Sequence, residues 1–406
     1  MLITGLINFT LKISDIQFFM KFKLFAVSLA VATFSTCIIA VNLSPSTGSV
    51  KAGNYGYIDK TGKLVIKSQF REVKNFSQGL AAVKIADKWG YTNKTGKLVI
   101  KPEFSNARSF SEGLAAVKLD DKWGYVDTTG KMVVTPEFND TYGFFEELAA
   151  IQINSRWGYI DRTGKFVIKP RFGSAYSFSE GLAAVVNDGY ELGYIDKTGK
   201  QIISIESSAG IIGIERFSQG LAVVETGGGG TCGPVICAYA YIDKTGKKIV
   251  EQPFFEAREF SEKLAAVATY SEQYLGRNIN GNAIDDWGYI NKLGQLVIKP
   301  KFNEANSFSE GLAAVNIGKK SIYSYKAGDT SITEISGKWG YIDGTGKQVI
   351  SPQFDLANSF AEGLAAVKIK NKCGYINKIG KVVVKRKFAT CAEFSEGLAA
   401  VKTFGQ

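Results

Sequence analysis

Apolar and polar positions alternate along this chain in short runs that are typical of β-strands. Residues 114–117 form the apolar run Leu-Ala-Ala-Val, and Trp123 and Tyr125 follow it two positions apart. Side chains two residues apart lie on the same face of a strand, so both runs are predicted to be strands. Residues 128–130 (Thr-Thr-Gly) predict a hairpin turn, because Gly tolerates positive φ, and residues 132–134 predict the returning strand.

The stretch before the apolar run allows two interpretations. Phe104, Ala107 and Phe110 are three residues apart, which fits one turn of a helix. The segment also fits a fourth strand that turns at residues 111–113 (Ser-Glu-Gly). With either choice, each unit is predicted to be a meander of three or four short antiparallel strands.

This unit returns nine times, and the first copies are 34 residues apart. Its Trp-Gly-Tyr strand begins at Tyr55, Trp89, Trp123, Trp157, Leu192, Tyr239, Trp287, Trp339 and Cys373. Its apolar run begins at Leu80, Leu114, Leu148, Leu182, Leu221, Leu264, Leu312, Leu364 and Leu398. One unit is too small to bury its own apolar face, so the period predicts stacked units that share a core. We therefore predict an all-β tandem array of nine repeats, whose core contains Trp89, Trp123, Trp157, Trp287 and Trp339.

The array could coil as an open superhelical solenoid or close as a propeller-like ring. A closed ring requires its first and last units to meet. The end copies depart from the pattern, with Tyr55 and Cys373 in place of Trp, which is typical of caps on an open stack. The sequence therefore favours the open solenoid, with the closed ring as the alternative.

The repeated acidic residues are predicted to be structural. Asp at the hairpin turn is exchanged for Asn in three copies, at Asn93, Asn291 and Asn377. Both residue types can accept a main-chain N–H in an Asx-turn, whereas only Asp is a base or a strong cation ligand. The acid of the Ser-Glu-Gly turn is similarly exchanged for Gln78 and Gln219.

The N-terminal residues 1–41 are predicted to be a targeting segment. Lys21 and Lys23 precede an uncharged run at residues 24–41, and Met20 is the expected start of this signal. The run is also long enough for an uncleaved membrane anchor. Residues 42–54 would then link it to the array at residues 55–406, and the protein would be exported to the periplasm, the cell surface or the medium.

Four cysteines are disulfide candidates in an exported chain. Cys232 and Cys237 flank four residues of one inserted loop, which favours a local bridge. Cys373 and Cys391 occupy core positions of the last copy and could face each other. Two buried free thiols are the alternative for this second pair.

Three insertions mark the most informative surface for function. The connection between the apolar run and the Trp position is enlarged in three consecutive copies, at residues 225–238, 268–286 and 316–338. Insertions at one repeat position map to one face of the array. The candidate ligand-binding residues in these loops are Tyr270, Tyr274, Arg277, Lys319, Lys320, Tyr323 and Tyr325. Clustered Tyr with Lys or Arg suits stacking on sugars and hydrogen bonding to acidic groups. The alternative is that these surface loops vary in sequence without serving a binding function.

The repeats resemble the WG repeat, also called the KWG repeat, of bacterial proteins. The resemblance lies in residues 122–138 (Lys-Trp-Gly-Tyr-Val-Asp-Thr-Thr-Gly-Lys-Met-Val-Val-Thr-Pro-Glu-Phe) and 178–185 (Phe-Ser-Glu-Gly-Leu-Ala-Ala-Val). It covers nearly everything after residue 54, with departures at Leu192, Tyr239 and Cys373. It implies an all-β repeat fold and no general catalytic motif.

Composition argues against most catalytic chemistry. The chain has no His, which removes the commonest general base and imidazole metal ligand. We therefore expect no enzyme, no cofactor and no metal, although a glycosidase built on carboxylates such as Asp286 and Asp329 stays open. Residues 278–286 only faintly resemble a calcium loop, because Asn stands where Asp is expected.

The net charge of +11 favours anionic surroundings. The expected function is that of an exported, non-catalytic binding or scaffold module for a protein or an anionic glycan. The alternative is a carbohydrate or cell-wall binder that uses the loop aromatics. Nucleic acid is disfavoured as a partner, and membrane contact is expected only through the N-terminal segment.

Overall fold

The computed structural model describes most of the predicted array. The described residues are 52–187, 189–205, 211–226, 238–250, 254–269, 286–318, 325–326, 329–330 and 337–404. The predicted targeting segment and most of the predicted linker lie outside them. Within the described residues, no helix is both long and apolar enough to cross a bilayer.

The described strands form nine blades, which confirms the prediction of an all-β fold with nine repeats. Blade 1 contains β3 (Glu72–Val73), β4 (Leu80–Ile85), β5 (Lys88–Asn93) and β6 (Leu98–Phe104). Blade 2 contains β7 (Asn106–Ala107), β8 (Leu114–Leu119), β9 (Lys122–Asp127) and β10 (Met132–Phe138). Blade 3 contains β11 (Asp140–Thr141), β12 (Ala149–Ile153), β13 (Arg156–Ile160) and β14 (Phe166–Phe172). Blade 4 contains β15 (Ser174–Ala175), β16 (Ala183–Val186), β17 (Leu192–Ile195) and β18 (Gln201–Ile205).

The remaining blades follow in the same order. Blade 5 contains β19 (Ile211–Ser218), β20 (Leu221–Thr226) and β21 (Ala238–Asp243). Blade 6 contains β22 (Glu256–Ala257), β23 (Leu264–Thr269), β24 (Asp286–Asn291) and β25 (Leu296–Phe302). Blade 7 contains β26 (Glu304–Ala305), β27 (Leu312–Ile317), β30 (Lys338–Asp343) and β31 (Gln348–Phe354), with the hairpin of β28 (Tyr325–Lys326) and β29 (Asp329–Thr330) between β27 and β30. Blade 8 contains β32 (Leu356–Ala357), β33 (Leu364–Ile369), β34 (Lys372–Asn377) and β35 (Val382–Phe388).

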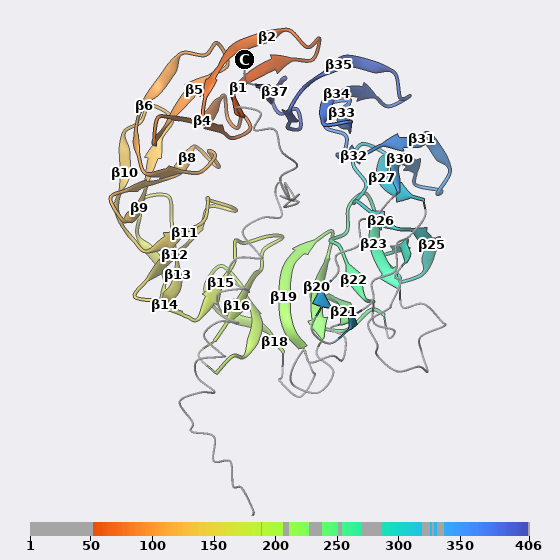
Figure 1. The fold of residues 1–406 in the computed structure, drawn as a ribbon. Coiled ribbons are helices and arrows are strands. Elements are labelled where there is room, and N and C mark those ends of the chain that lie inside the picture. The colour runs from red at the N-terminus through yellow and green to blue at the C-terminus, as the bar shows by residue number, and fades with distance from the viewer. Residues whose placement is uncertain are drawn as a thin grey trace, which may run out of the picture. The chain divides into compact units, whose positions relative to one another are not determined.

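Within a blade the strands are antiparallel and follow each other in chain order. The Phe-x-x-Ala stretch, for which a helical turn or a strand was predicted, is a short first strand; Asn106 and Ala107 pair with Lys118 and Val117. The first strand is the inner edge of each blade, and the fourth strand forms the outer rim (Figure 1). One end of the ring carries the hairpins between strands two and three, and we call it the loop face. The opposite end carries the Ser-Glu-Gly and Asp-x-Thr-Gly turns, and we call it the turn face.

The ninth blade is built from both ends of the array, in the order β2-β1-β37-β36. It joins β36 (Thr390–Cys391) and β37 (Leu398–Phe404) to β1 (Ala52–Asp59) and β2 (Leu64–Phe70). Tyr57 faces Ala400 across this joint, just as Tyr91 faces Ala82 inside blade 1. The array is therefore a closed nine-bladed β-propeller (Figure 1).

The favoured prediction of an open solenoid is therefore wrong. The departures at the two end copies are not caps, because the chain enters the ring in the middle of a blade. The first strand of the chain, β1, takes the third place in its blade, and the last strand of the chain, β37, takes the second place in the same blade. Each half lacks the partner that the other half supplies, so pairing them removes two exposed sheet edges and closes the ring.

Apolar contacts between neighbouring blades form the core. The Trp of one blade lies in one cluster with the first-strand Ala of the next blade, as Trp89 does with Ala107. Where Leu192 replaces Trp, the larger Ile214 replaces Ala, so the volume at that joint is kept. The five tryptophans are buried in these joints, with 5–7% of their surface exposed.

Each blade also donates a buried hydrogen bond to the next. The third-strand Tyr hydroxyl donates to a first-strand carbonyl of the following blade, over 2.6–2.8 Å in all nine blades. These side chains are Tyr57, Tyr91, Tyr125, Tyr159, Tyr194, Tyr241, Tyr289, Tyr341 and Tyr375, all at most 1% exposed. A hydroxyl buried in this way needs a partner, so each blade depends on its neighbour to satisfy it.

A second set of nine hydrogen bonds runs around the turn face. The Glu or Gln of each Ser-Glu-Gly turn accepts a main-chain N–H from the corresponding turn of the next blade, over 2.7–3.1 Å. This residue has a φ of 51–55° in all nine blades, and the residue after it is also left-handed. Two successive left-handed residues make the two-residue hairpin turn that favours Gly at the second place.

The Asp-x-Thr-Gly turns have the predicted Asx geometry. Oδ1 of Asp59 accepts bonds from the Thr61 and Lys63 main-chain nitrogens, at 2.9 and 3.0 Å. Asn93 accepts the same two bonds from Thr95 and Lys97, at 3.1 and 3.0 Å. The turn therefore needs the acceptor oxygen and not the charge, which confirms the structural interpretation of the exchange between Asp and Asn.

A disulfide joins blade 8 to blade 9. Cys373 takes the Trp position and Cys391 takes the Ala position of this joint, with an S–S distance of 2.03 Å and a Cα–Cα distance of 6.0 Å. The bond therefore replaces an apolar contact beside the blade where the chain closes. Cys232 and Cys237, the other candidate pair, lie outside the described residues.

Reducing this bond is expected to lower the free energy of unfolding by about 3 kcal/mol, because it closes a loop of 18 residues in the unfolded chain. Urea unfolding with and without reductant measures the change. The variant C373A/C391A is the control, and its unfolding midpoint should respond to reductant only as far as the predicted Cys232–Cys237 bridge contributes. Equal stability of the native protein in both conditions would contradict the proposed contribution.

Candidate functional site

The sequence-predicted loop residues can be placed only in part. Tyr270, Tyr274, Arg277, Lys319, Lys320 and Tyr323 lie outside the described residues. Tyr325 lies in β28, where its backbone pairs with Thr330 of β29.

The strand ends that carry the three enlarged loops are well defined. Each loop joins a second strand to a third strand, and the last pairs before the loops are Thr226 with Ala238, Thr269 with Asp286, and Ile317 with Lys338. Blades 5, 6 and 7 are neighbours in the ring, so the strand ends that flank the three loops lie side by side on the loop face. In blade 1, by contrast, only two residues separate Ile85 from its partner Lys88.

A ring of side chains on the innermost strands forms a second feature of the loop-face half. We call these nine residues, which directly follow each first-strand Ala position, the collar. The collar residues are Lys74, Arg108, Tyr142, Tyr176, Glu215, Arg258, Asn306, Asn358 and Ala392. Their carbonyls accept the buried tyrosine hydroxyls, so the backbone of the collar is fixed while its side chains vary.

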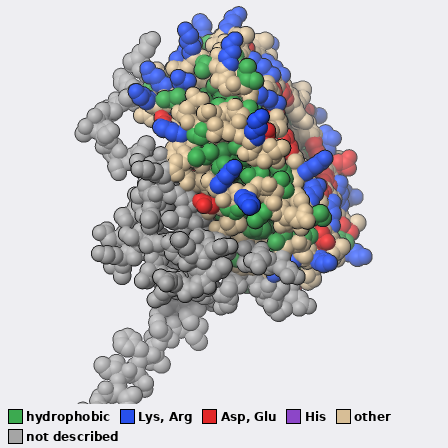
Figure 2. Space-filling view, turned by 90° about the vertical axis from the view of Figure 1, so that its right-hand side faces the viewer, with side chains coloured by type: hydrophobic (Ala, Val, Ile, Leu, Met, Phe, Trp, Pro, Cys, Tyr) green, Lys and Arg blue, Asp and Glu red, His purple; other side chains and the backbone are tan. Residues whose placement is uncertain are grey.

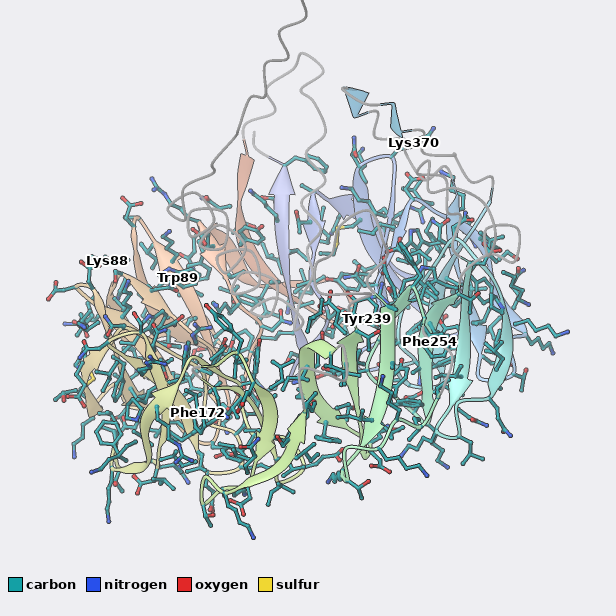
Figure 3. All side chains as sticks on the ribbon, turned by 90° about the horizontal axis from the view of Figure 1, so that it is seen from below. Lys88, Trp89, Phe172, Tyr239, Phe254 and Lys370 are labelled. Atoms are coloured by element: carbon teal, nitrogen blue, oxygen red, sulfur yellow. A yellow bond between two sulfur atoms is a disulfide. The ribbon has the colours of Figure 1, made fainter. Side chains whose placement is uncertain are left out.

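Collar side chains lie over the Trp position of their own blade. The Arg108 guanidinium is 4.9 Å from the Trp123 ring centre, and that of Arg258 is 5.0 Å from Trp287. Tyr142 stacks on Trp157 with ring centres 5.3 Å apart. Figure 3 shows Trp89 next to Lys88, at the hairpin end of blade 1. In blade 5, Tyr239 replaces Trp and forms an isolated β-bridge with Phe254, which lies outside the three named strands of this blade (Figure 3).

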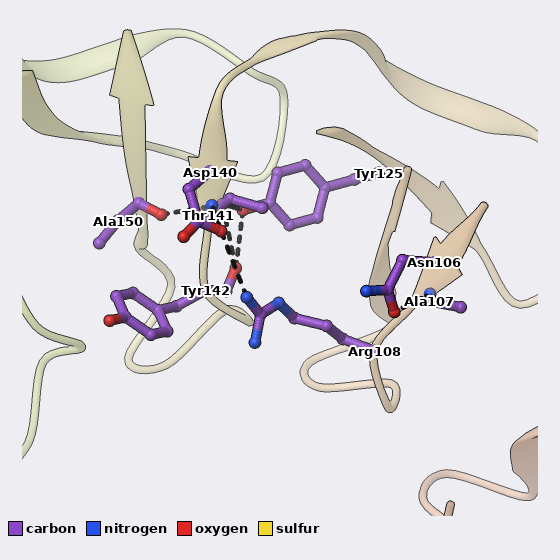
Figure 4. A network of polar contacts seen from close by, with 8 residues as sticks. All are labelled: Asn106, Ala107, Arg108, Tyr125, Asp140, Thr141, Tyr142 and Ala150. Carbon is purple, nitrogen blue, oxygen red and sulfur yellow. Dashed lines mark hydrogen bonds and ion pairs between the residues drawn. The ribbon is translucent and has the colours of Figure 1, made fainter. Parts of the chain in front are cut away.

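The collar of blades 2 and 3 contains a polar network (Figure 4). Arg108 Nη2 donates to Asp140 Oδ1 at 3.3 Å, and the same oxygen accepts the Thr141 N–H at 2.8 Å. Thr141 is buried where most blades have Ala, and its hydroxyl bonds to Tyr125 and to the Ala150 carbonyl. The buried Arg108 Nε has no hydrogen-bond partner among the described residues, but the contacts of its Nη2 with Asp140 and of its guanidinium with Trp123 hold Arg108 in place, which suits a structural role rather than proton transfer.

The inner wall of blades 5 to 7 is rich in carboxyl groups. Arg216 holds Glu259 in a two-point contact of 2.8 and 3.0 Å. Burial, reinforced by the charge of Glu259 and opposed by Arg216, raises the pKa of Glu215 to about 7. Burial also raises the pKa values of Glu256 and Glu304. These groups lie in the same three blades that carry the enlarged loops.

The collar therefore differs in chemistry from blade to blade. Blades 1, 2 and 6 present the basic residues Lys74, Arg108 and Arg258, whereas blade 5 presents Glu215, whose pKa is raised to about 7. Burial, followed by the charge of Arg108, lowers the pKa of Lys74. The sequence pattern missed the collar, because its residues differ from blade to blade; the signal was their fixed place one residue after the Ala position.

Two other observations bear on chemistry. Among the described residues, no group of His, Cys, Asp and Glu side chains is arranged to hold a metal ion. A depression of about 520 Å³ lies at blade 4, lined by Arg171, Phe172, Asn187, Ile195, Gly199 and Gln201. Arg171 Nη2 donates a hydrogen bond to the Gly199 carbonyl across this depression at 2.6 Å, so the guanidinium of Arg171 already has a partner within the protein.

The raised pKa of Glu215 predicts a pH dependence of stability. The folded protein keeps this proton up to about pH 7, whereas an unfolded carboxyl loses it near its ordinary value of 4.5. The contribution of Glu215 to the free energy of unfolding is therefore fully present below pH 4.5, and it is lost as the pH rises through about 7. We expect the native melting temperature to fall more steeply between about pH 5 and pH 8 than that of Glu215→Gln. Parallel slopes in calorimetry would contradict this assignment.

Comparison with known proteins agrees with the repeat structure. The family model described as "WG containing repeat" matches residues 55–89, 89–123, 123–157, 157–190, 193–229, 287–320, 339–373 and 374–403. No curated protein matches the chain. A crystal structure of "the eukaryotic initiation factor" is similar with a TM-score of 0.53 and 10% identity, covering 82% of this chain and 95% of that one. BamB from Moraxella catarrhalis has a TM-score of 0.39 and 12% identity, covering 83% and 98%. The family matches span most of the ring, and the chain belongs to the WG containing repeat family.

Proposed function

We propose that this protein is an exported, non-catalytic binding scaffold whose ligand is a protein or an anionic glycan of the cell surface. The observation that carries the proposal is the position of the enlarged loops, which leave the same end of three successive blades. Loops on a rigid scaffold are where binding residues concentrate. The hydrogen bonds between blades supply that rigidity.

The use of the repeated carboxylates supports a non-catalytic role. Asp59 and Asp127 each accept a hydroxyl hydrogen bond from the Thr two residues later, which is the main cause of their lowered pKa values. Glu396 accepts the Gly79 N–H and pairs with Lys94 at 3.0 Å. These groups are engaged in holding turns and blades, so they are poorly placed to act as bases.

Export is supported by two features. Lys21 and Lys23 before the apolar run at residues 24–41 are typical of a targeting segment. The disulfide between Cys373 and Cys391 fits an oxidising compartment outside the cytoplasm.

A carbohydrate ligand held by the loop aromatics is the second candidate. The carboxyl groups of Glu215, Glu256 and Glu304 favour it, because carboxyl oxygens accept hydrogen bonds from sugar hydroxyls. Under this candidate the tyrosines of the loops 268–286 and 316–338 stack on sugar rings and the inner wall supplies polar contacts.

Shortening the three loops tests the proposal. The variant carries the nine-residue spacing of blade 1 in blades 5, 6 and 7, and it is compared with the native chain on insoluble cell-wall polysaccharide and on immobilised surface proteins. We expect an unchanged melting temperature and loss of whichever binding the native chain shows. The control variant replaces Ala86 and Asp87 of blade 1 with Asn and Gly, which favour the same two-residue turn, and should bind normally. Equal retention of the native and shortened chains, or no binding by the native chain, would contradict the proposal.

A further inference from the structure

The Asp-x-Thr-Gly turns of blades 6 and 8 differ from those in the rest of the ring, whereas the outward apolar residues of the rim are similarly exposed in the other blades, as Leu64 and Val167 are. In most blades a Thr stands two residues after the turn acid and donates its hydroxyl to that acid, as Thr61 does to Asp59 at 2.6 Å. In blades 6 and 8 this Thr is replaced by Leu293 and Ile379, and the acid is replaced by Asn. The same two turns have therefore lost a carboxylate and gained an apolar side chain.

These two side chains protrude from the turn face. Leu293 is 75% exposed and Ile379 is 79% exposed, more than any other large apolar side chain in the described residues. The turn backbone is unchanged, because the main-chain nitrogens of both residues still donate to Asn291 and Asn377, at 3.0 and 3.3 Å. Leu293 and Ile379 therefore sit where Thr sits elsewhere, at the tip of a well-formed turn, and their exposure is not caused by a distorted loop.

Further apolar side chains continue from these tips onto the rim. A β-bulge at the start of each fourth strand lets two successive apolar residues face outward. In this part of the ring they are Leu296, Val297, Val349, Val382 and Val383, each 41–50% exposed. Figure 2 shows this side of the molecule, with apolar side chains interleaved with Lys and Arg.

The charge on this part of the rim has one sign. The fourth strands β25, β31 and β35 contain no acidic residue and carry Lys299, Lys301, Lys385, Arg386 and Lys387. By comparison, β6 and β10 carry Glu103 and Glu137 at the position of Lys301 and Lys387, whereas β2 and β14 also lack an acidic residue. Basic side chains beside protruding apolar ones fit a surface that has negative charge outside and hydrocarbon beneath.

We propose that blades 6, 7 and 8 dock on an anionic phospholipid bilayer. Leu293 and Ile379 enter the boundary between head groups and acyl chains, and the lysines of β25 and β35 contact lipid phosphates. This contact is separate from the membrane contact expected of the N-terminal segment, and it is independent of the ligand proposed for the loop face.

A tryptophan at one tip tests the contact directly. The full-length variants Leu293→Trp and Thr95→Trp are mixed with phosphatidylglycerol vesicles that carry brominated acyl chains, which quench indole fluorescence at short range. Thr95 is the matched control, because it holds the same place in blade 1, on an Asn turn. We expect loss of the new indole's fluorescence in Leu293→Trp and not in Thr95→Trp. The comparison holds whether or not the N-terminal segment inserts, since both variants contain it.

Two outcomes would overturn the proposal. No quenching of either new indole would show that these blades do not reach the bilayer, and equal quenching would show that the ring has no preferred side. A second measurement uses Leu293→Thr with Ile379→Thr, which restores the residue of the other turns and should not affect folding. This variant is expected to partition onto the same vesicles about tenfold more weakly than the native chain. Undiminished partitioning would equally contradict insertion of the tips.

Discussion

The contact between neighbouring blades is the interaction on which the rest of the structure depends. Each blade buries one Tyr whose hydroxyl is satisfied only by a carbonyl of the next blade. Each blade also offers a Trp-sized surface that the first strand of its neighbour covers. An open stack would leave an apolar face exposed to water at each of its two ends, which is unfavourable. Closure of the ring removes both.

The departures from the repeat show how strictly this contact is maintained. At two joints a residue smaller than Trp meets one larger than Ala in the next blade, as Leu192 meets Ile214 and Tyr55 meets Val73, whereas Tyr239 meets the ordinary Ala257. At the joint between blades 8 and 9, Cys373 and Cys391 replace the pair by a covalent bond. These irregular copies are therefore adapted joints in a closed ring, not caps that pack loosely.

Strands, turns and the structural role of the turn acids could be predicted from the sequence, because they follow from local periodicity and from the exchange between Asp and Asn. Closure could not be predicted from one repeat. The sequence feature that indicated closure was the type of strand at each end of the array. The array begins with a Trp-type strand at Tyr55 and ends with an apolar run at Leu398, and these two strand types are neighbours within one blade. The collar was missed because Arg108 and Glu215 share a position but not a chemistry. The apolar tips Leu293 and Ile379 were equally visible in the sequence, but only the turn geometry shows that they protrude.

Both proposed binding surfaces rely on a closed, rigid ring, and the pairing of β1 with β37 is what closes it. Tyr55 and Lys402 face each other in this pair, and directly opposed residues are close enough for an engineered disulfide. The most direct measurement is therefore mass spectrometry of the oxidised variant Tyr55→Cys/Lys402→Cys after proteolysis. A closed propeller predicts peptides linked between residues 55 and 402 of one molecule. Free thiols at both positions, or links formed only between molecules, would contradict closure.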